Sequence, residues 1–177
     1  MNKQNEEKEK LKLLSRSLNE LEHGFILVEG LKDKSALIKL GYLENKIFTM
    51  SGNLVLSLKK IQELADQNED LAEQKVYVLA DLDRRGEQQA QKAKEELEAN
   101  NMRADIELRR IIGRILNMTH FEEMQTSYSN FMDQVHQNPK IGKDAYSELN
   151  DEEIIDKKTK NEEKNIEMKN NMKNKKR

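Results

Sequence analysis

The chain of 177 residues contains no cysteine, which excludes disulfides, thiolate metal ligands and a thiol nucleophile. Its histidines are few and scattered, at His23, His120 and His136, and their spacing does not predict a zinc site. No apolar stretch approaches the roughly 20 residues that a membrane-spanning helix needs, and the N-terminus has no hydrophobic signal region. We therefore expect a soluble, cytoplasmic protein that does not interact with membranes.

Charge is abundant but unevenly spread. Charged residues make up 36% of the chain, the mean hydropathy is -0.94 and the formal net charge is -2. The charges concentrate in 2–12 and 151–177, while the middle of the chain has the composition of a normal hydrophobic core. With so small a net charge, contact with nucleic acid would have to come from a local basic patch.

The C-terminal part of the chain has little to bury. Beyond Pro139, which is the only proline, large apolar residues become rare, so we predict that 151–177 is disordered or only transiently helical. Its last residues, 169–177, carry lysines and an arginine but no acid. This basic end is either a contact for a phosphate backbone or simply a solubilising tail.

One stretch organises the rest of the sequence. Residues 76–80 form a short, continuously apolar run, which predicts a strand buried on both faces of a parallel sheet. A helical pattern follows at 88–98 and opens near Gly86. Asp81 and Asp83 lie between strand and helix, two residues apart, so both carboxylates point to one side if the chain stays extended. They are expected at the carboxyl edge of the sheet, where open α/β sheets bind ligands.

Strands and helices alternate through the middle of the chain, which predicts a parallel sheet with right-handed crossovers. The expected strands are 25–28, 47–50, 76–80 and a more polar edge strand at 102–106. The expected helices are 2–21, 33–40, 54–65, 88–99, 109–116 and 120–132. In the first helix Leu11, Leu14, Leu18 and Leu21 form one narrow stripe, which favours a helix packed against the domain edge over a dimerising coiled coil.

The strand at 25–28 also ends in an acid, Glu29, followed by Gly30. For Glu29 to meet Asp81 and Asp83, the two strands must be neighbours, which predicts the strand order 2-1-3-4. Carboxylate oxygens without His or Cys suit Mg²⁺ or Mn²⁺ better than zinc. Because Mg²⁺ is usually shared between carboxylates and phosphate oxygens, the expected substrate is a phosphodiester or a nucleotide.

Two motifs together resemble the TOPRIM domain. The first is ILVEG at 26–30 with Asp33, and the second is LADLD at 79–83 with Gly86. The resemblance covers about 25–124. The family includes type IA and type II topoisomerases, bacterial-type primases, recombination-repair proteins, overcoming-lysogeny nucleases and the nuclease that matures 5S ribosomal RNA.

The resemblance implies an α/β fold, with a Rossmann-like open parallel sheet of about four strands flanked by helices. The expected organisation is an N-terminal amphipathic helix over 1–23, the TOPRIM domain over 24–135 and a charged, largely disordered tail over 136–177.

The resemblance also implies roles for individual residues. Asp81 and Asp83 are expected to hold Mg²⁺, with Mn²⁺ as a substitute. Glu29 is expected to act as general acid or base and is a further candidate metal ligand. Lys32 and Arg84, with Arg85 beside it, flank the acids and are candidates to neutralise phosphate charge as a transition state develops.

Other polar residues have simpler explanations. Asp33 is expected mainly to cap a helix, with help to the metal second, and 51–53 are expected to form an ordinary strand-to-helix cap. Arg109, Arg110 and Arg114 are expected to form a basic surface rather than a catalytic group. The pair at 122–123 is interpreted as a solvated helix face rather than a remote part of the site.

Three functional hypotheses follow from the resemblance. The tyrosines have no context typical of a topoisomerase nucleophile, and the lack of cysteine argues against the zinc region of a primase. We therefore favour a stand-alone TOPRIM enzyme, a metal-dependent nuclease that processes RNA rather than DNA. The alternatives are a non-catalytic module that binds metal and nucleic acid or a partner protein, and a primase-like nucleotidyltransferase.

Overall fold

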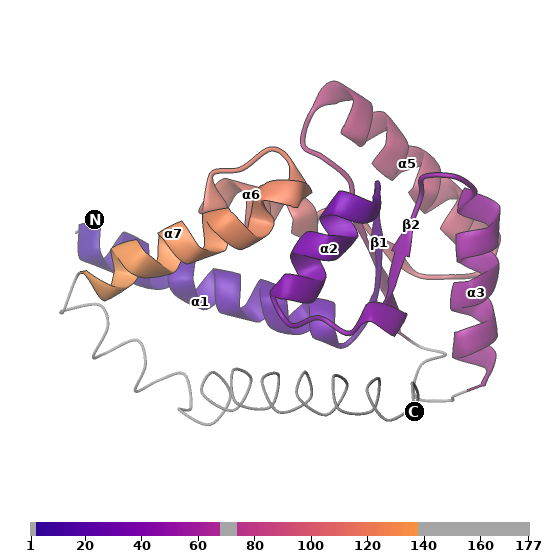
Figure 1. Cartoon of the computed structure of the whole chain (residues 1–177), viewed down its shortest axis with the longest axis horizontal. Helices are drawn as coiled ribbons and strands as arrows, with labels where there is room; N and C mark the ends of the chain where they lie inside the picture. The colour runs from indigo at the N-terminus through magenta and orange to yellow at the C-terminus, as the bar shows by residue number, and fades with distance from the viewer. Residues whose placement is uncertain (1–2, 68–73, 138–177) are drawn as a thin grey trace, which may run out of the picture.

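The computed structural model describes residues 3–67 and 74–137, which form an α/β fold around one four-stranded sheet (Figure 1). The predicted tail therefore lies outside the described residues, apart from its first two positions. The strands are β1 (Phe25–Val28), β2 (Ile47–Thr49), β3 (Val76–Leu79) and β4 (Ala104–Asp105). The helices are α1 (Lys3–Glu22), α2 (Leu31–Lys39), α3 (Leu54–Asp66), α5 (Arg84–Ala99), α6 (Leu108–Leu116) and α7 (Met124–His136), with short 3₁₀ turns η1 (Glu44–Lys46) and η2 (Phe121–Glu123).

The order of the strands is β2-β1-β3-β4, and all of them run parallel. This confirms the order predicted from the acids at the strand ends. β1 lies at the centre, where Val28 pairs with Thr49 of β2 and with Leu79 of β3. Every residue of β1 and β3 is buried, because helices cover both faces of the sheet.

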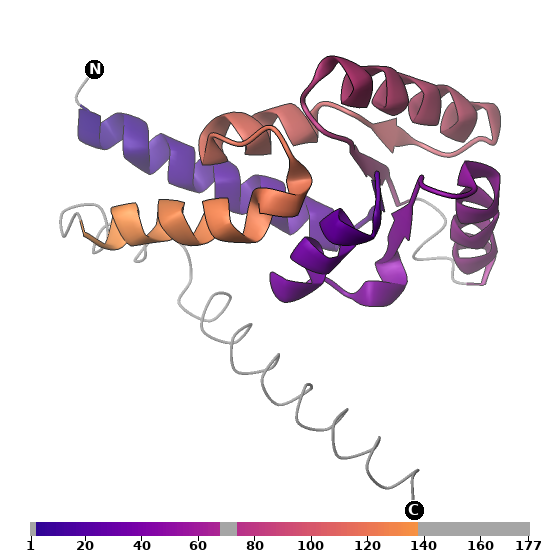
Figure 2. The ribbon, with the colours of Figure 1, turned by 45° about the horizontal axis from the view of Figure 1, so that its top comes forward.

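Alternate residues of the central strands face two separate hydrophobic layers. Ile26 and Leu79 belong to the layer covered by α1, α2, α6 and α7. Leu27 and Val78 belong to the opposite layer, covered by α3 and α5. Figure 2 shows the arrangement, with α5 and α3 on one side of the strands and the other helices across from them. Because successive side chains of a strand point to opposite faces, each central strand contributes to both hydrophobic layers.

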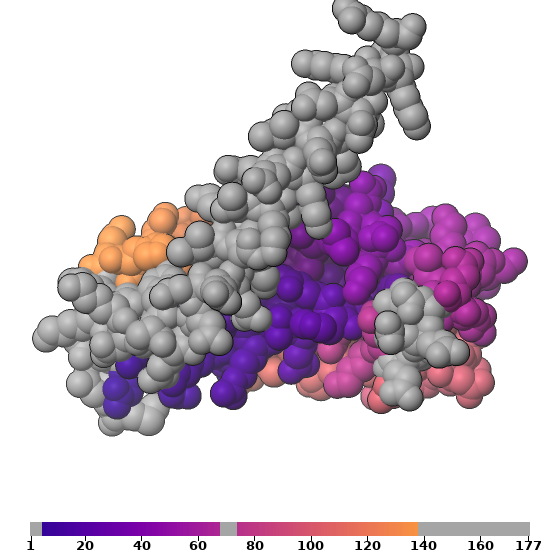
Figure 3. Space-filling view, turned by 90° about the horizontal axis from the view of Figure 1, so that it is seen from below, coloured from indigo at the N-terminus to yellow at the C-terminus, as the bar shows by residue number. Residues whose placement is uncertain are grey.

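Helix α1 lies against the fold with its leucine stripe, as predicted for a helix packed at the domain edge. Leu14 and Leu21 are buried in the hydrophobic layer that contains Ile26 of the sheet. Leu11 packs with Val135 of α7. The two helices lie side by side in Figures 1 and 2. In the space-filling view of Figure 3 the indigo and orange surfaces of α1 and α7 lie toward one end, and the magenta surface of α3 lies toward the other.

The boundaries differ most from the predictions in three elements. The edge strand is reduced to Ala104–Asp105, because the ladder to β3 extends over only two residue pairs. Helix α5 begins at Arg84, where Asp83 caps it. Helix α7 starts after the 3₁₀ turn η2 and continues to His136. Within the described residues, no helix has both the length and the apolarity needed to cross a membrane.

Candidate active site

Glu29 and Asp81 meet at the carboxyl edge of the sheet. Because Val28 pairs with Leu79 in parallel register, the residues that follow these strands leave the sheet at the same edge. The backbone N–H of Asp81 donates to Oε1 of Glu29 at 3.0 Å. The acids that close the two central strands are therefore in direct contact, which is the neighbourhood that the strand order was predicted to create.

The carboxylate of Asp81 is held on both of its oxygens by a segment that follows α6. The backbone N–H of Phe121 donates to Oδ1 at 3.0 Å, and Nδ1 of His120 lies 2.7 Å from Oδ2. The N–H of Leu82 also donates to the carbonyl of Thr119 at 2.8 Å. Residues 119–121 thus fix the orientation of Asp81.

Sequence reasoning considered His120 only as a zinc ligand and missed this contact with Asp81. His120 lies 39 positions beyond Asp81 along the chain, so no local spacing indicates the pairing. The hydrogen bond to Asp81 is also the main cause that raises the pKa of His120.

Asp83 is exposed and caps α5. Its Oδ1 accepts from the backbone N–H of Gly86 at 2.6 Å, which satisfies one of the free donors at the start of the helix. Gly86 itself is buried against the backbone of Asp81, and a Cβ at this position would lie 2.1 Å from the Asp81 carbonyl oxygen. A glycine here allows α5 to start immediately behind the acidic turn.

Asp33 and Asn53 cap the N-termini of α2 and α3, as expected. Oδ2 of Asp33 accepts from the N–H of Gly30 at 2.8 Å, and the Asn53 side chain accepts from the N–H of Leu56 at 3.2 Å. Asp33 is only 7% exposed. Burial is the largest cause that raises its pKa, and the charges of Asp81 and Glu122 raise it further.

Glu29 experiences the same kind of environment. Burial is the largest cause that raises its pKa, the hydrogen bond from Asp81 opposes this, and the charges of Asp81 and Asp33 add to the increase. Three carboxylates thus repel one another in a partly desolvated place, and a cation among them would relieve that repulsion. The donor set and its electrostatics therefore fit a hard divalent ion such as Mg²⁺.

The acids are not, however, gathered as a finished ligand cage. Within residues 3–67 and 74–137, no three Asp, Glu or His side chains come together in a way that could hold one metal ion. Each acid is instead engaged by protein donors, as described for Glu29, Asp81 and Asp83. The second oxygen of Asp83 makes no hydrogen bond within this part of the chain and remains open to a ligand.

The predicted basic residues are distributed unequally around the acids. Nζ of Lys32 forms an ion pair with Oε2 of Glu122 at 3.2 Å, and both side chains are exposed, as expected for Glu122 on a solvated face. Arg84 is exposed and forms no hydrogen bond or ion pair in the described residues. Arg85 lies close enough to Glu29 for its charge to oppose the rise in the pKa of Glu29. With its amide oxygen and nitrogen exchanged, the side chain of Gln89 donates to Oε2 of Glu29 at 2.8 Å and accepts from Nε of Arg85 at 3.2 Å.

Arg109 is fully buried, at 0% exposed, so its prediction as part of a basic surface was wrong. Nη1 donates to the carbonyls of Asp81 at 2.9 Å and Ala80 at 3.3 Å, and Nε donates to the carbonyl of Ile106 at 3.1 Å. Its Nη2 forms an ion pair with Glu87 of α5. The guanidinium thus joins the end of β3 to α5 and α6, a position that the run of arginines in the sequence did not indicate.

The geometry defines a class of protein: a parallel α/β domain with an acidic, potentially metal-binding site at the ends of its two central strands. The family comparison is more specific. The model of the Toprim domain matches residues 24–112. The chain therefore belongs to the Toprim family, whose domains bind Mg²⁺ and act on nucleic acids, and it has a metal-binding, nucleic-acid-related function.

Similar proteins are known from archaea and from a bacterium. A UPF0292 protein of Thermococcus sibiricus is 37% identical over 93 residues, which cover 52% of this chain and 67% of the relative. A UPF0292 protein of Thermococcus gammatolerans is 37% identical over 102 residues, which cover 58% and 69%. A solved structure described as a putative protein from Aquifex aeolicus is 33% identical, with a TM-score of 0.46, and the match covers 62% of this chain and 95% of that one.

Proposed function

We propose that this protein is a Mg²⁺-dependent nuclease that cleaves phosphodiester bonds in RNA. The observation that carries the proposal is the hydrogen bond from the N–H of Asp81 to Oε1 of Glu29. It brings a carboxylate suited to proton transfer next to Asp81, whose carboxylate is suited to metal binding, at the edge where parallel sheets bind their ligands.

Each residue has a role that its surroundings support. Asp81 and Asp83 would hold the ion, with Glu29 beside them, and Mg²⁺ when bound would supply positive charge to the reacting phosphate. Glu29 takes up or delivers the proton. Its raised pKa lies closer to neutral pH than that of an ordinary carboxyl, which suits a general acid or base. Lys32 and the arginines at 84–85 offer positive charge to the phosphate oxygens.

Two of the three tyrosines in the described residues, Tyr42 and Tyr77, are poorly placed for a covalent mechanism. Tyr77 is 5% exposed, and burial raises its pKa to about 12. Tyr42 is turned inward and donates its hydroxyl to the carbonyl of Leu18 at 3.1 Å. Burial also raises the pKa of Tyr42. Neither hydroxyl is placed to attack a phosphate, which favours hydrolysis assisted by the acids.

A second candidate is a non-catalytic module that binds metal and nucleic acid. The observation that favours it is the engagement of both Asp81 oxygens by His120 and Phe121. A carboxylate held in this way has less freedom to bind an ion in the geometry that catalysis requires.

Cleavage assays with purified protein separate the two candidates. Labelled structured RNA, single-stranded RNA and DNA are incubated with Mg²⁺, Mn²⁺ or EDTA, beside an Asp81→Asn/Asp83→Asn double variant. Asn at position 83 still caps a helix, so α5 is retained. Asp133→Asn, at an exposed position of α7, removes the same charge away from the acids. The nuclease proposal expects metal-dependent cleavage of RNA that is lost only in the double variant.

Two other outcomes would overturn the proposal. If the wild type shifts RNA on a gel but cuts no substrate with either metal, the binding module replaces the nuclease. If the products appear only when nucleoside triphosphates are supplied and are longer than the substrate, the chemistry is nucleotidyl transfer.

A further inference from the structure

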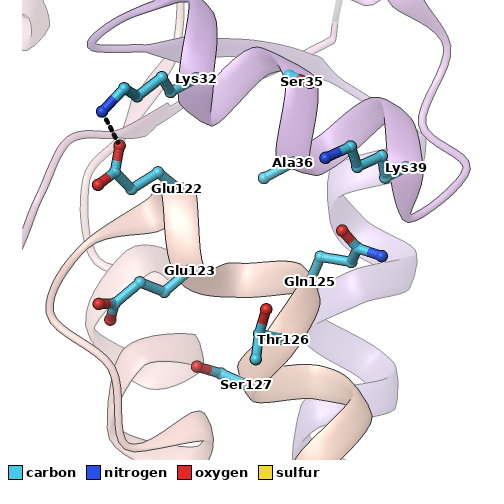
Figure 4. Close-up of a pocket in the computed structure, with 9 residues that line it drawn as sticks. All are labelled: Lys32, Ser35, Ala36, Lys39, Glu122, Glu123, Gln125, Thr126 and Ser127. Carbon is cyan, nitrogen blue, oxygen red and sulfur yellow. Dashed lines mark ion pairs between the residues drawn. The ribbon is translucent and has the colours of Figure 1, made fainter.

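A pocket of about 490 Å³ lies beside the acidic site, between α2 and the segment formed by η2 and α7 (Figure 4). Its first wall is the face of α2 that carries Lys32 and Lys39, seven positions apart and so two helical turns along the same face. Its second wall carries two acids from η2, Glu122 and Glu123, and the uncharged Gln125 and Thr126 from α7. The volume falls in the range of about 300–1,000 Å³ that is typical of pockets for small ligands.

The inner end of the pocket is lined by Lys32 and Glu122, which lie next in sequence to residues of the candidate active site. Lys32 is the neighbour of Asp33, and its ion pair with Glu122 spans the pocket at this end, as the dashed line in Figure 4 shows. Glu122 in turn follows Phe121, whose N–H holds Asp81. The charge of Glu122 also raises the pKa of Asp33, which places it within electrostatic reach of the acids. The pocket and the acids thus share the segments α2 and 119–122.

The outer end is chemically different. Figure 4 places Lys39 opposite Gln125, away from the pair of Lys32 and Glu122. Lys39 is exposed and has no ion pair in the described part of the chain, so its charge is available to an anion. Gln125 and Thr126 offer hydrogen-bond donors and acceptors without charge. The floor between the walls includes Ala36, which is buried and apolar.

We infer that this pocket binds a nucleotide of single-stranded nucleic acid, on one side of the phosphodiester that the acidic site handles. Lys39 contacts a backbone phosphate, Gln125 and Thr126 hydrogen-bond the sugar or the edge of the base, and the apolar floor contacts the ring. The inference rests on the proposed function, since it assigns a second part of the substrate to the same site.

The second wall of the pocket lies outside the residues that the Toprim model matches. The match ends at residue 112, whereas the residues of η2 and α7 that line the pocket lie beyond it. The acids and α2 lie within the match.

Binding without catalysis tests the inference independently of the nuclease proposal. Fluorescence anisotropy is measured in EDTA with labelled oligouridylate and oligothymidylate of about 12 nucleotides, a length that covers a typical single-strand site. Lys39→Gln removes the charge at the outer end, and Lys60→Gln removes an exposed charge on α3 as its control. Thr126→Tyr fills the pocket, and Ser129→Tyr places the same side chain on an exposed position of α7 that does not line it.

The expected result is a loss of affinity of about 5- to 10-fold for Lys39→Gln and for Thr126→Tyr, with both controls within about 2-fold of wild type. Lys39→Gln should also lower the slope of log affinity against log salt by about 1, because one phosphate contact is lost. Comparison of the two oligonucleotides shows whether RNA or DNA is preferred.

The inference is overturned if the wild type binds neither oligonucleotide, or if both pocket variants bind like their controls. Circular dichroism of each variant verifies that the fold is retained. A protein that binds through the pocket but never cuts would contradict the nuclease proposal alone. A protein that cuts RNA equally well with the pocket filled would contradict this inference alone.

Discussion

Nη1 of the buried Arg109 donates to the backbone carbonyl of Asp81 at 2.9 Å, so the acidic turn is anchored by a side chain inside the fold. The same guanidinium reaches Glu87 on α5 and the carbonyl of Ile106. The position of Asp81 therefore depends on α5 and α6 as much as on its own strand.

Replacing Arg109 should weaken both the fold and the site. Arg109→Lys keeps the charge but cannot reach the carbonyls and Glu87 at once, which leaves buried acceptors unpaired. We expect a loss of about 2–4 kcal/mol in the free energy of unfolding, measured by urea denaturation. The matched control is Arg110→Lys, at an exposed neighbour that also pairs with Glu87, and it should change stability little. Equal losses in both variants would contradict the anchoring role of Arg109.

Gly86→Ala should disturb the acidic turn directly. The added Cβ would meet the Asp81 carbonyl oxygen at 2.1 Å, so either α5 or the turn must move. We expect a lower melting temperature and a smaller stabilisation by Mg²⁺, both from thermal melts with and without the ion. Gly30→Ala is the control, because its Cβ would lie 3.9 Å from the nearest atom, Oδ2 of Asp33. If Gly86→Ala melts like the wild type, the fold does not require the close packing of Gly86 against the backbone of Asp81.

Glu29→Gln should stabilise the metal-free protein at neutral pH. Burial raises the pKa of Glu29, so the folded state favours the protonated form and the charged form costs stability as the pH rises through the folded pKa. Gln keeps an oxygen that can accept from the N–H of Asp81. The gain should appear in melts at neutral pH and disappear below the ordinary pKa of 4.5, where the carboxyl is protonated in both states.

Addition of Mg²⁺ provides the second half of that test. The wild type should gain more melting temperature than Glu29→Gln, because the ion relieves a repulsion that the variant lacks. A variant that is less stable than the wild type at neutral pH would show that the carboxylate is needed for the fold itself.

His120→Ala should loosen Asp81 without removing any acid. The side chain of His120 fixes the Oδ2 oxygen, and loss of such a partner to a metal-binding carboxylate typically lowers metal affinity about 10- to 100-fold. Mn²⁺ titration by calorimetry measures this effect, and circular dichroism monitors the fold. The control His23→Ala removes an exposed histidine at the end of α1. Tighter binding in His120→Ala would instead mean that the histidine competes with the ion.

Much of the fold could be predicted from the sequence, because its signals are local. The apolar runs at 25–28 and 76–80 are strands since both faces of the sheet are covered, and the acids that follow them indicated the strand order. The opening of a helix near Gly86 was predicted from the same short motif, whereas the cap that Asp83 forms on that helix was not.

The supports of the site could not be predicted in this way. His120 and Phe121 reach Asp81 only because the segment after α6 folds back over the end of β3. Arg109 is charged, as surface residues usually are. Its burial depends on carbonyls and a glutamate supplied by other elements. Such contacts have no period in the sequence, since each partner comes from a different part of the chain.

The contact between Leu11 of α1 and Val135 of α7 joins nearly opposite ends of the described chain. A contact of such long range forms only after the intervening chain has been ordered, and it adds to the loop-closure entropy that slows folding. During synthesis the strands and their acids can emerge and pair well before α7 is complete. His120 and Phe121, which hold Asp81, leave the ribosome only after all four strands have been made.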